Sequence, residues 1–326
     1  MIERLDQFMA RANAAYYASR DPFQDFTTSP EIAQAFGEVL GAWAAVVWES
    51  MGCPAPVVLA ELGPGRGTLM ADALRAVAKA APRFRGALQV HLVEASPRLR
   101  AEQARRVPDA QWHGGIETLP PGPLILLANE FLDALPIRQL VRRAGGWVER
   151  FVEDGRFVER PVSHDGGDVQ EGAVVELGEA ARDLVAALAA RLAREGGAAL
   201  FLDYGPERSA PGESLQAIRA GRYADALAAP GEADLTAHVD FAALAVAARD
   251  ARARAWGPVP QGPFLARLGL FQRTDRLARS QPPARAAALI EAARRLAEPD
   301  RMGRLFNALC IAHPALPAPP GFEAAC

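Results

Sequence analysis

Residues 57–68 read Val57-Val58-Leu59-Ala60-Glu61-Leu62-Gly63-Pro64-Gly65-Arg66-Gly67-Thr68. The first half is an apolar run with β-branched residues, which is typical of a strand covered on both faces of a parallel sheet. The glycines at alternate positions allow a tight bend, and they let a ligand approach the main chain without meeting a Cβ atom. A glycine-rich turn at the carboxyl end of a parallel strand is where open α/β sheets bind nucleotide-like ligands.

The spacing of the glycines separates the candidate ligands. A phosphate-binding P-loop requires a lysine in its motif, and none follows this loop. A dinucleotide turn, Gly-x-Gly-x-x-Gly, would place its third glycine at Thr68 instead of Gly67. The pattern Glu61-x-Gly63-x-Gly65-x-Gly67 fits S-adenosyl-L-methionine (SAM), whose ammonium group Glu61 could help hold. A strand–helix turn without any ligand is the alternative, because glycine clusters alone are weak signals.

Two further strands are expected beside this loop. Residues 88–94 are expected to form the next strand, which ends in Glu94. A carboxylate at this strand tip can accept hydrogen bonds from both ribose hydroxyls of an adenosine. The alternative is an exposed acid near the start of the next helix. Residues 110–114 look like a short strand, in which Trp112 or the neighbouring backbone would lie beside the adenine. A core position is the alternative for Trp112.

A fourth strand, residues 123–128, runs into a polar segment that begins with Asn129, Glu130 and, three residues later, Asp133. Burying polar groups unpaired costs about 2–7 kcal/mol, so polar residues at the end of such a strand usually serve a ligand. In the alternative interpretation Asn129 caps a helix and Glu130 is a solvated charge.

Three segments together resemble the MidA-like family of SAM-dependent methyltransferases: the glycine loop, the run Asn129–Pro136 and the upstream run Asp25–Ile32. The likeness extends to residues 203–205, 231–241, 257–262 and 302–306. The family includes a mitochondrial assembly factor that methylates an arginine on a core subunit of respiratory complex I. The resemblance therefore implies an α/β, Rossmann-like class I methyltransferase fold, SAM as cofactor and a protein substrate. It also implies that the loop with Thr28 and Ser29 covers the cofactor or the substrate.

An arginine acceptor sets a chemical requirement. Its guanidinium, with a pKa of about 12.5–13.8, is a poor nucleophile while fully delocalised. A carboxylate that holds the planar fork can concentrate electron density on the attacking nitrogen. We predict Glu130 as that carboxylate and Asn129 as the group that fixes its geometry. Asp133, or the segment with His238 and Asp240, could add a second polar group, although His238 could equally be structural.

Three other functions stay open at this point. A small molecule could replace the protein arginine as methyl acceptor. A dinucleotide-dependent oxidoreductase could use a similar sheet, and it would require a differently spaced glycine turn. A binding module with a vestigial methyltransferase fold is the third, which the intact glycine loop and Asn129-Glu130 disfavour.

The chain is expected to have three parts. Residues 1–51 form a helical extension, with helices at 2–18 and 30–49 and with Ser29 as N-cap of the second. Residues 52–205 form the SAM-binding core, interrupted by a β-hairpin excursion at about 137–176. Residues 206–326 complete the sheet with two more strands and cover the substrate side, with a loop-rich stretch at 206–236 and a surface tail at 314–322.

Composition agrees with an ordinary globular enzyme. The 326 residues are 50% hydrophobic and 23% charged with a net charge of −3, and no basic stripe suggests nucleic acid as a partner. Cys53, Cys310 and Cys326 show no metal spacing, so we expect no metal and a reducing compartment. The sequence shows neither a membrane span nor a clear signal or transit peptide, and we expect a cytoplasmic protein. Oligomeric state is open, with a homodimer as one alternative.

Overall fold

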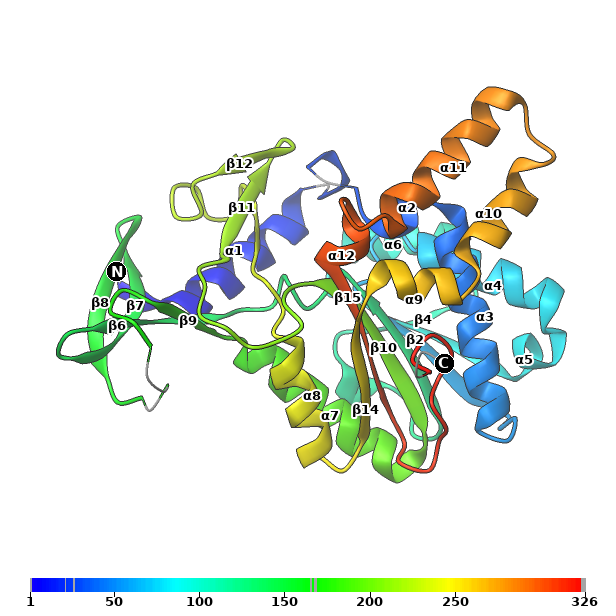
Figure 1. Ribbon diagram of the computed structural model, residues 1–326, viewed down its shortest axis with the longest axis horizontal. Coiled ribbons are helices and arrows are strands. Elements are labelled where there is room, and N and C mark those ends of the chain that lie inside the picture. Colours follow the sequence, from blue (N-terminus) through cyan, green and yellow to red (C-terminus); the bar gives the residue numbers. More distant parts are fainter. Residues whose placement is uncertain (1, 21, 26, 165, 167–168, 324–326) are drawn as a thin grey trace.

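The computed structural model describes residues 2–20, 22–25, 27–164, 166 and 169–323. Phe26, inside the Asp25–Ile32 run, and Cys326 lie outside the described residues. A large α/β part holds a central sheet, and a smaller sheet with the N-terminus lies at the opposite end of the molecule (Figure 1). Helix α1 (Leu5–Ser19) runs from the small sheet towards the centre (Figure 1).

The central sheet has the strand order β14-β15-β10-β5-β2-β3-β4. Its members are β2 (Val57–Leu62), β3 (Leu88–Val93), β4 (Gln111–His113), β5 (Leu124–Asn129), β10 (Gly197–Tyr204), β14 (Arg254–Pro260) and β15 (Phe306–Ala312). The strands from β10 to β4 pair in parallel, whereas β15 is antiparallel to both β10 and β14. The predicted α/β fold is confirmed, and β14 and β15 are the two late strands that complete the sheet.

Strand β2 shows why the sheet needs helices on both faces. Its residues are all buried, and they alternate between two cores, with Val57 and Leu59 in one and Val58 and Ala60 in the other. The first core includes residues of α3 (Gln34–Ser50), α4 (Thr68–Ala80), α5 (Pro82–Ala87), α9 (Gln261–Arg267), α10 (Leu270–Ala278) and α11 (Pro283–Ala297). The second includes residues of α7 (Glu179–Glu195) and α8 (Phe241–Asp250). This two-sided burial explains the nearly continuous apolar sequence of the central strands.

The N-terminal residues differ from the prediction. Ile2–Arg4 form strand β1, which pairs antiparallel with β7 instead of continuing a helix. With β7 (Gly146–Glu153) they belong to a sheet that also contains β6 (Arg138–Arg143), β8 (Arg156–Val162) and β9 (Val174–Leu177). The antiparallel pair predicted around residues 137–152 is confirmed as β6 and β7.

The segment that links α1 to the core was only partly predicted. The expected helix at 30–49 is two helices, α2 (Ser29–Ile32) and α3, which are separated by the extended residue Ala33. Ser29 is the first residue of α2, and the capping position belongs to Thr28. The predicted cap at Ser29 is therefore wrong. A short 3₁₀ turn, η1 (Pro22–Gln24), precedes this segment.

Residues 206–236 contain more structure than expected. They form a small sheet of β11 (Gln216–Arg219), β12 (Arg222–Ala224) and β13 (Asp234–Thr236), in the order β12-β11-β13. A third core joins this sheet to α1 and β7 through residues such as Met9, Ala217 and Leu235. These strands are too short to show a clear alternating pattern, so sequence alone indicated only a loop.

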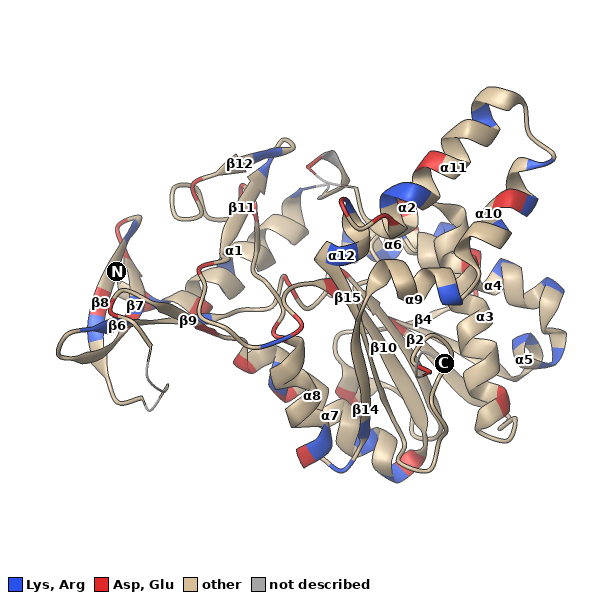
Figure 2. Cartoon of the chain, in the orientation of Figure 1, with Lys and Arg blue, Asp and Glu red and all other residues tan. Residues whose placement is uncertain are grey.

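The C-terminal stretch is not simply a surface tail. Phe322 is buried, and its ring lies 5.1 Å from that of Phe264 in α9. The remaining elements are α6 (Pro97–Arg106), η2 (Ile116–Thr118) and α12 (Met302–Leu305). Figure 2 shows Lys and Arg interleaved with Asp and Glu along the outer helices and loops, while the central strands carry few charges. Within the described part of the chain, no helix is long and apolar enough to cross a bilayer.

Candidate active site

The glycine loop adopts a backbone that requires glycine. Gly63, Gly65 and Gly67 have φ angles of +57°, +52° and +79°, in the left-handed region that side chains with a Cβ avoid. The Gly63 N–H donates to the Val93 carbonyl at 3.1 Å, which ties the loop to the end of β3. The Gly67 N–H donates to the Pro64 carbonyl at 2.7 Å, and α4 begins at the next residue. The loop thus turns the chain sharply from β2 into α4.

Two aromatic rings rest directly on this loop. A Cβ at Gly63 would lie 2.6 Å from Cδ2 of Phe131, and one at Gly65 would lie 2.7 Å from Cζ of Phe23. The guanidinium carbon of Arg66 lies 4.4 Å from the centre of the Phe23 ring, a cation–π distance. Both glycines are therefore also positions of close approach.

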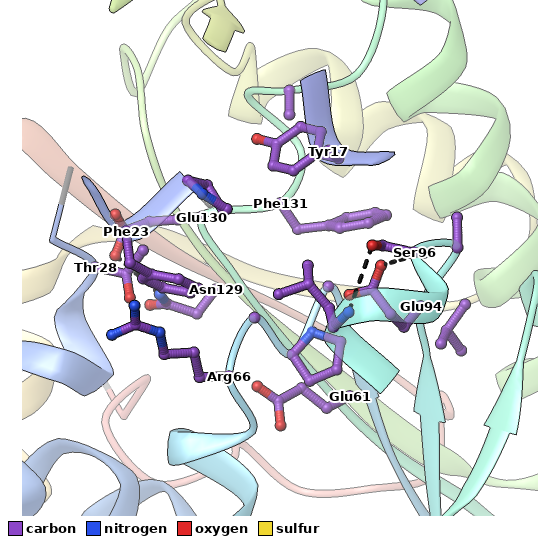
Figure 3. Close-up of a pocket in the computed structure, with 18 of the residues that line it drawn as sticks. Tyr17, Phe23, Thr28, Glu61, Arg66, Glu94, Ser96, Asn129, Glu130 and Phe131 are labelled. Carbon is purple, nitrogen blue, oxygen red and sulfur yellow. Dashed lines mark hydrogen bonds between the residues drawn. The ribbon is translucent and has the colours of Figure 1, made fainter. Parts of the chain in front are cut away.

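Above the loop is a cavity of about 500 Å³, a size suited to a small-molecule cofactor (Figure 3). It is bounded by the ends of β2, β3 and β5, by η1 and α2, and by α1. Its walls include these predicted site residues: Thr28, Glu61, Gly63, Gly65, Thr68, Glu94, Asn129 and Glu130. Ser29, Gly67, Trp112 and Asp133 were also predicted, and they lie outside this lining.

Glu61 is a buried carboxylate that lacks a full set of partners. It is 3% exposed and faces the cavity, and burial raises its pKa to about 8, against the opposing effect of a hydrogen bond from the Met70 N–H. Among the described residues, no hydrogen-bond donor reaches its Oε2 atom. A buried carboxylate oxygen without a donor is costly, so the position suits a ligand cation.

Glu94 is held rigidly at the tip of β3. Its Oε1 accepts the Ser96 N–H at 2.7 Å (Figure 3). Its Oε2 accepts Nε2 of Gln103 at 3.2 Å. Burial raises the pKa of Glu94, and these two donors oppose that rise. Trp112 instead donates from Nε1 to Oε1 of Gln103 at 2.8 Å and packs against the first core. It therefore supports Gln103 from behind and does not form the cavity wall.

Asn129 and Glu130 lie together at the end of β5. Nδ2 of Asn129 donates to Oε1 of Glu130 at 2.9 Å, and the same oxygen accepts the Ser29 N–H at 2.7 Å. Glu130 has a φ of +50°, an uncommon angle for a residue with a Cβ, and its own N–H donates to the Leu202 carbonyl at 2.9 Å. Burial raises its pKa, and the two donors oppose that rise. Strained backbone angles of this kind cluster at active sites and ligand-binding sites.

Asp133 and Asp203 lie behind this wall. Oδ2 of Asp203 accepts the N–H groups of Phe131, Leu132 and Asp133 at 3.1, 2.8 and 3.3 Å, so Asp203 shapes the loop that carries Glu130. Burial, followed by the charges of Asp203 and Asp234, raises the pKa of Asp133 well above its usual value.

His238 and Asp240 line a second cavity of about 290 Å³ instead. The His238 ring is exposed and packs edge-on against Tyr204 at 5.4 Å. Asp240 caps α8 by accepting the Ala243 N–H at 2.9 Å.

Several wall residues were missed by the sequence analysis: Tyr17, Phe23, Ser96 and Phe131. Phe131 belongs to a quoted run and could have been included. Tyr17 and Phe23 lie far along the chain from the strand ends, and no local pattern places them there.

The sheet, the glycine loop and the acidic strand tips define a nucleoside-binding α/β enzyme of the SAM-dependent methyltransferase class. A family of S-adenosyl-L-methionine-dependent methyltransferases, Methyltransf_28, matches residues 39–259, and the chain belongs to it. The cofactor is therefore S-adenosyl-L-methionine. Membership decides against the dinucleotide-dependent oxidoreductase.

Named relatives agree with this assignment. The chain is 35% identical to the mitochondrial protein arginine methyltransferase NDUFAF7 of Danio rerio, over 97% of this chain and 83% of that protein. It is 32% identical to the human protein of that name, over 94% of this chain and 78% of the relative. A COG1565 superfamily protein from Burkholderia thailandensis, solved with S-adenosylhomocysteine, matches with a TM-score of 0.81 and 28% identity over 99% of this chain and 89% of that one.

Proposed function

We propose that this methyltransferase modifies an arginine side chain of a protein substrate. The observation that carries the proposal is the Glu130 carboxylate, which faces the cavity and receives hydrogen bonds from both Ser29 and Asn129. A carboxylate is the preferred partner of a guanidinium, because the two planar groups can form parallel hydrogen bonds. The names of the NDUFAF7 relatives support the same acceptor.

In this proposal the end of the cavity that Glu61 and Glu94 line holds the cofactor. Glu61 pairs with its ammonium group, and Glu94 accepts hydrogen bonds from the ribose hydroxyls. Gly63, Gly65 and Gly67 allow the close approach of the main chain, while Thr28 and Thr68 close the rim. Ser29 acts indirectly, through its N–H bond to Glu130.

The acceptor chemistry then falls to Glu130 and Asn129. When bound, S-adenosyl-L-methionine supplies an activated methyl carbon, whose bond to sulfur breaks with the electron pair staying on sulfur. Glu130 accepts N–H bonds from the guanidinium and takes the proton that the attacking nitrogen loses as the N–C bond forms. A carboxylate whose pKa is raised by burial is better matched to that role than an exposed one. Asn129 keeps the carboxylate in place, and Asp133 and Asp203 support the loop from behind.

The family resemblance supports part of the biological setting that we propose. We propose a cytoplasmic protein that methylates a subunit of respiratory complex I during assembly. The NDUFAF7 relatives are named as mitochondrial proteins, and that location is a property of those relatives.

Labelled SAM tests the acceptor directly. The protein is incubated with isotope-labelled SAM and a lysate from cells that lack this gene product, and labelled peptides are sequenced by mass spectrometry. The expected result is label on an arginine of a protein. Label confined to small molecules, or to another side chain, would contradict the proposal.

A pair of glutamate variants tests the role of Glu130. Glu130→Gln is expected to retain cofactor binding and to lose at least about 100-fold in transfer rate, the order of magnitude for removing a general base. Glu207→Gln changes an exposed glutamate outside the cavity lining and serves as the control. Equal rates for the two variants would remove Glu130 from the mechanism.

A further inference from the structure

The cavity has a second end that cofactor-binding residues do not account for. Asn13 and Tyr17 of α1 line it together with Phe131 and Leu135 of the loop after β5. In Figure 3, Tyr17 lies on the side of the cavity opposite to Glu61. This end is built from two segments that are more than 100 residues apart, so its assembly depends on tertiary contacts.

Tyr17 is fixed in this wall by a buried carboxylate. Its hydroxyl donates to Oδ1 of Asp234 in β13 at 2.7 Å, and Asp234 is 4% exposed. One turn earlier, Nδ2 of Asn13 donates to the carbonyls of Ala134 and Leu235 at 3.0 and 2.8 Å. These bonds lock α1 to the loop after β5 and to β13. The Tyr17 ring therefore presents a fixed aromatic surface to the cavity.

Four acidic side chains gather around the same region, and of these Glu130 lines the cavity. The four are Glu130, Asp133, Asp203 and Asp234, and burial raises the pKa of each. The charge of Arg295 lowers the pKa of Glu130, but this effect is smaller than that of burial. Buried carboxylates are normally paired, so the Glu130 carboxylate on the cavity wall suits a cationic group of a ligand.

A separate observation points to a hydrogen-bonding ligand. Oδ1 of Asn129 is an acceptor on the cavity wall, and within the described residues it has no donor, although Asn129 is only 8% exposed. Its Nδ2 is already used by Glu130. An acceptor left empty beside a carboxylate suits a ligand group that has several N–H donors in one plane.

We propose that this end of the cavity is the channel for the acceptor side chain, with the Tyr17 ring as its positioning wall and Asp234 as the residue that fixes the ring. The inference rests on the proposed arginine acceptor. The guanidinium stacks on the Tyr17 face, as planar cations do on aromatic rings, and its N–H groups reach Glu130 and Oδ1 of Asn129. The alkyl stem packs against Leu135. The ligand class is a long cationic side chain with a planar head.

Small probes test the channel without turnover. Calorimetry measures how tightly two probes bind to the wild-type protein in the presence of saturating S-adenosylhomocysteine. The probes are Nα-acetyl-L-arginine methylamide and its neutral citrulline counterpart. The two probes have nearly the same shape and differ in charge. The arginine probe is expected to bind at least about tenfold more tightly, as one charged hydrogen-bonded contact would provide. Equal affinity, or no binding of the arginine probe, would overturn the proposal.

Tyrosine variants then test the wall. Tyr17→Leu is expected to raise the KM for the methylated protein, or the Kd of the arginine probe, about tenfold, which lies between the values for an exposed and a fully desolvated cation–π contact. Its kcat and its affinity for S-adenosylhomocysteine should change little. Tyr17→Phe keeps the ring and loses the bond to Asp234, so an intermediate effect is expected. Tyr204→Phe is the matched control, because Tyr204 also donates to a side chain of β13, Thr236, at 2.6 Å and lies outside the cavity.

The outcomes separate this inference from the proposed function. Unchanged KM and probe affinity in both Tyr17 variants would overturn the channel even if arginine is the acceptor. Label on a different side chain would refute the arginine acceptor, while the probe measurements would still decide whether the channel selects a planar cation. If Tyr17→Leu loses S-adenosylhomocysteine binding through misfolding, Tyr17→Phe against Tyr204→Phe decides the question.

Discussion

Replacing Glu61 by glutamine is expected to stabilise the ligand-free protein at alkaline pH and to weaken its cofactor binding. Glu61 is 3% exposed at the end of β2, and burial raises its pKa to about 8 from an ordinary value of 4.5. Glutamine has nearly the same shape and no charge, so it removes the cost of ionising this buried group. The same change removes the only charge that we assign to the cofactor's ammonium group.

The magnitude follows from the two pKa values of Glu61. Below pH 4.5 the carboxyl is protonated in both the folded and the unfolded chain. Between pH 4.5 and about 8 the unfolded chain releases this proton and the folded one keeps it, so stability falls by about 1.4 kcal/mol per pH unit. The total loss by pH 8 is roughly 5 kcal/mol. Glutamine does not titrate, so the variant escapes this loss.

Urea denaturation of the ligand-free protein measures the effect. Between pH 6 and pH 8, the stability advantage of Glu61→Gln over the wild type should widen by roughly 3 kcal/mol. Glu38→Gln is the contrasting control. Glu38 is also buried but lies 2.5 Å from Nε of Arg273, and its pKa is lowered, so its loss should destabilise the protein. A pH-independent difference for Glu61→Gln would refute the assignment of Glu61 as a buried, unpaired acid.

Calorimetry with S-adenosylhomocysteine completes this test. Glu61→Gln should bind it about 10- to 100-fold more weakly, the order for one charge-assisted hydrogen bond. Wild-type affinity should rise with pH towards 8, because the ligand cation favours the ionised carboxylate. Unchanged affinity in the variant would show that the ammonium group lies elsewhere.

Three other substitutions give separate tests. Gly65→Val should abolish the binding of S-adenosylhomocysteine, which calorimetry measures. The φ angle of Gly65 is +52°, and a Cβ there would lie 2.7 Å from the Phe23 ring. Wild-type affinity in this variant would contradict the assignment of the loop to the cofactor. Glu130→Gln should retain cofactor affinity and lose methyl transfer in the labelling assay, and normal turnover would exclude its role. Gly197→Ala should lower the stability in urea by several kcal/mol, because its Cβ would overlap the Leu124 carbonyl in the central sheet, whereas an unchanged midpoint would argue against this packing.

The central sheet and its glycine loop could be predicted because their signals are local. Residues 57–68 combine a buried strand, three spaced glycines and a helix start in one window, and residues 123–130 combine a strand with its polar end. The residues of each segment therefore predict its local structure without information from distant parts of the chain. The structure therefore confirms the α/β fold and brings Glu61, Glu94, Asn129 and Glu130 to one cavity.

The rest of the site could not be predicted because its signals are distant in sequence. Tyr17 and Phe23 reach the cavity only through contacts of α1 and η1 with later segments. Strand β1 has three residues and owes its conformation to pairing with β7. Trp112 looked suited to the adenine, yet its N–H is satisfied by Gln103, a partner nine residues away on α6. Tertiary contacts decide such positions.

The bond between Asn13 and Leu235 has a consequence for biosynthesis. The two residues are 222 positions apart, and a ribosome adds about 5–20 residues per second, so roughly 10–45 seconds separate their appearance. During that interval the nascent chain can already contain β2, β3 and β5, while helix α1 has no β13 to attach to. The growing chain would thus form the part that binds the cofactor before the part that binds the acceptor side chain. It could transfer methyl groups only near the end of translation.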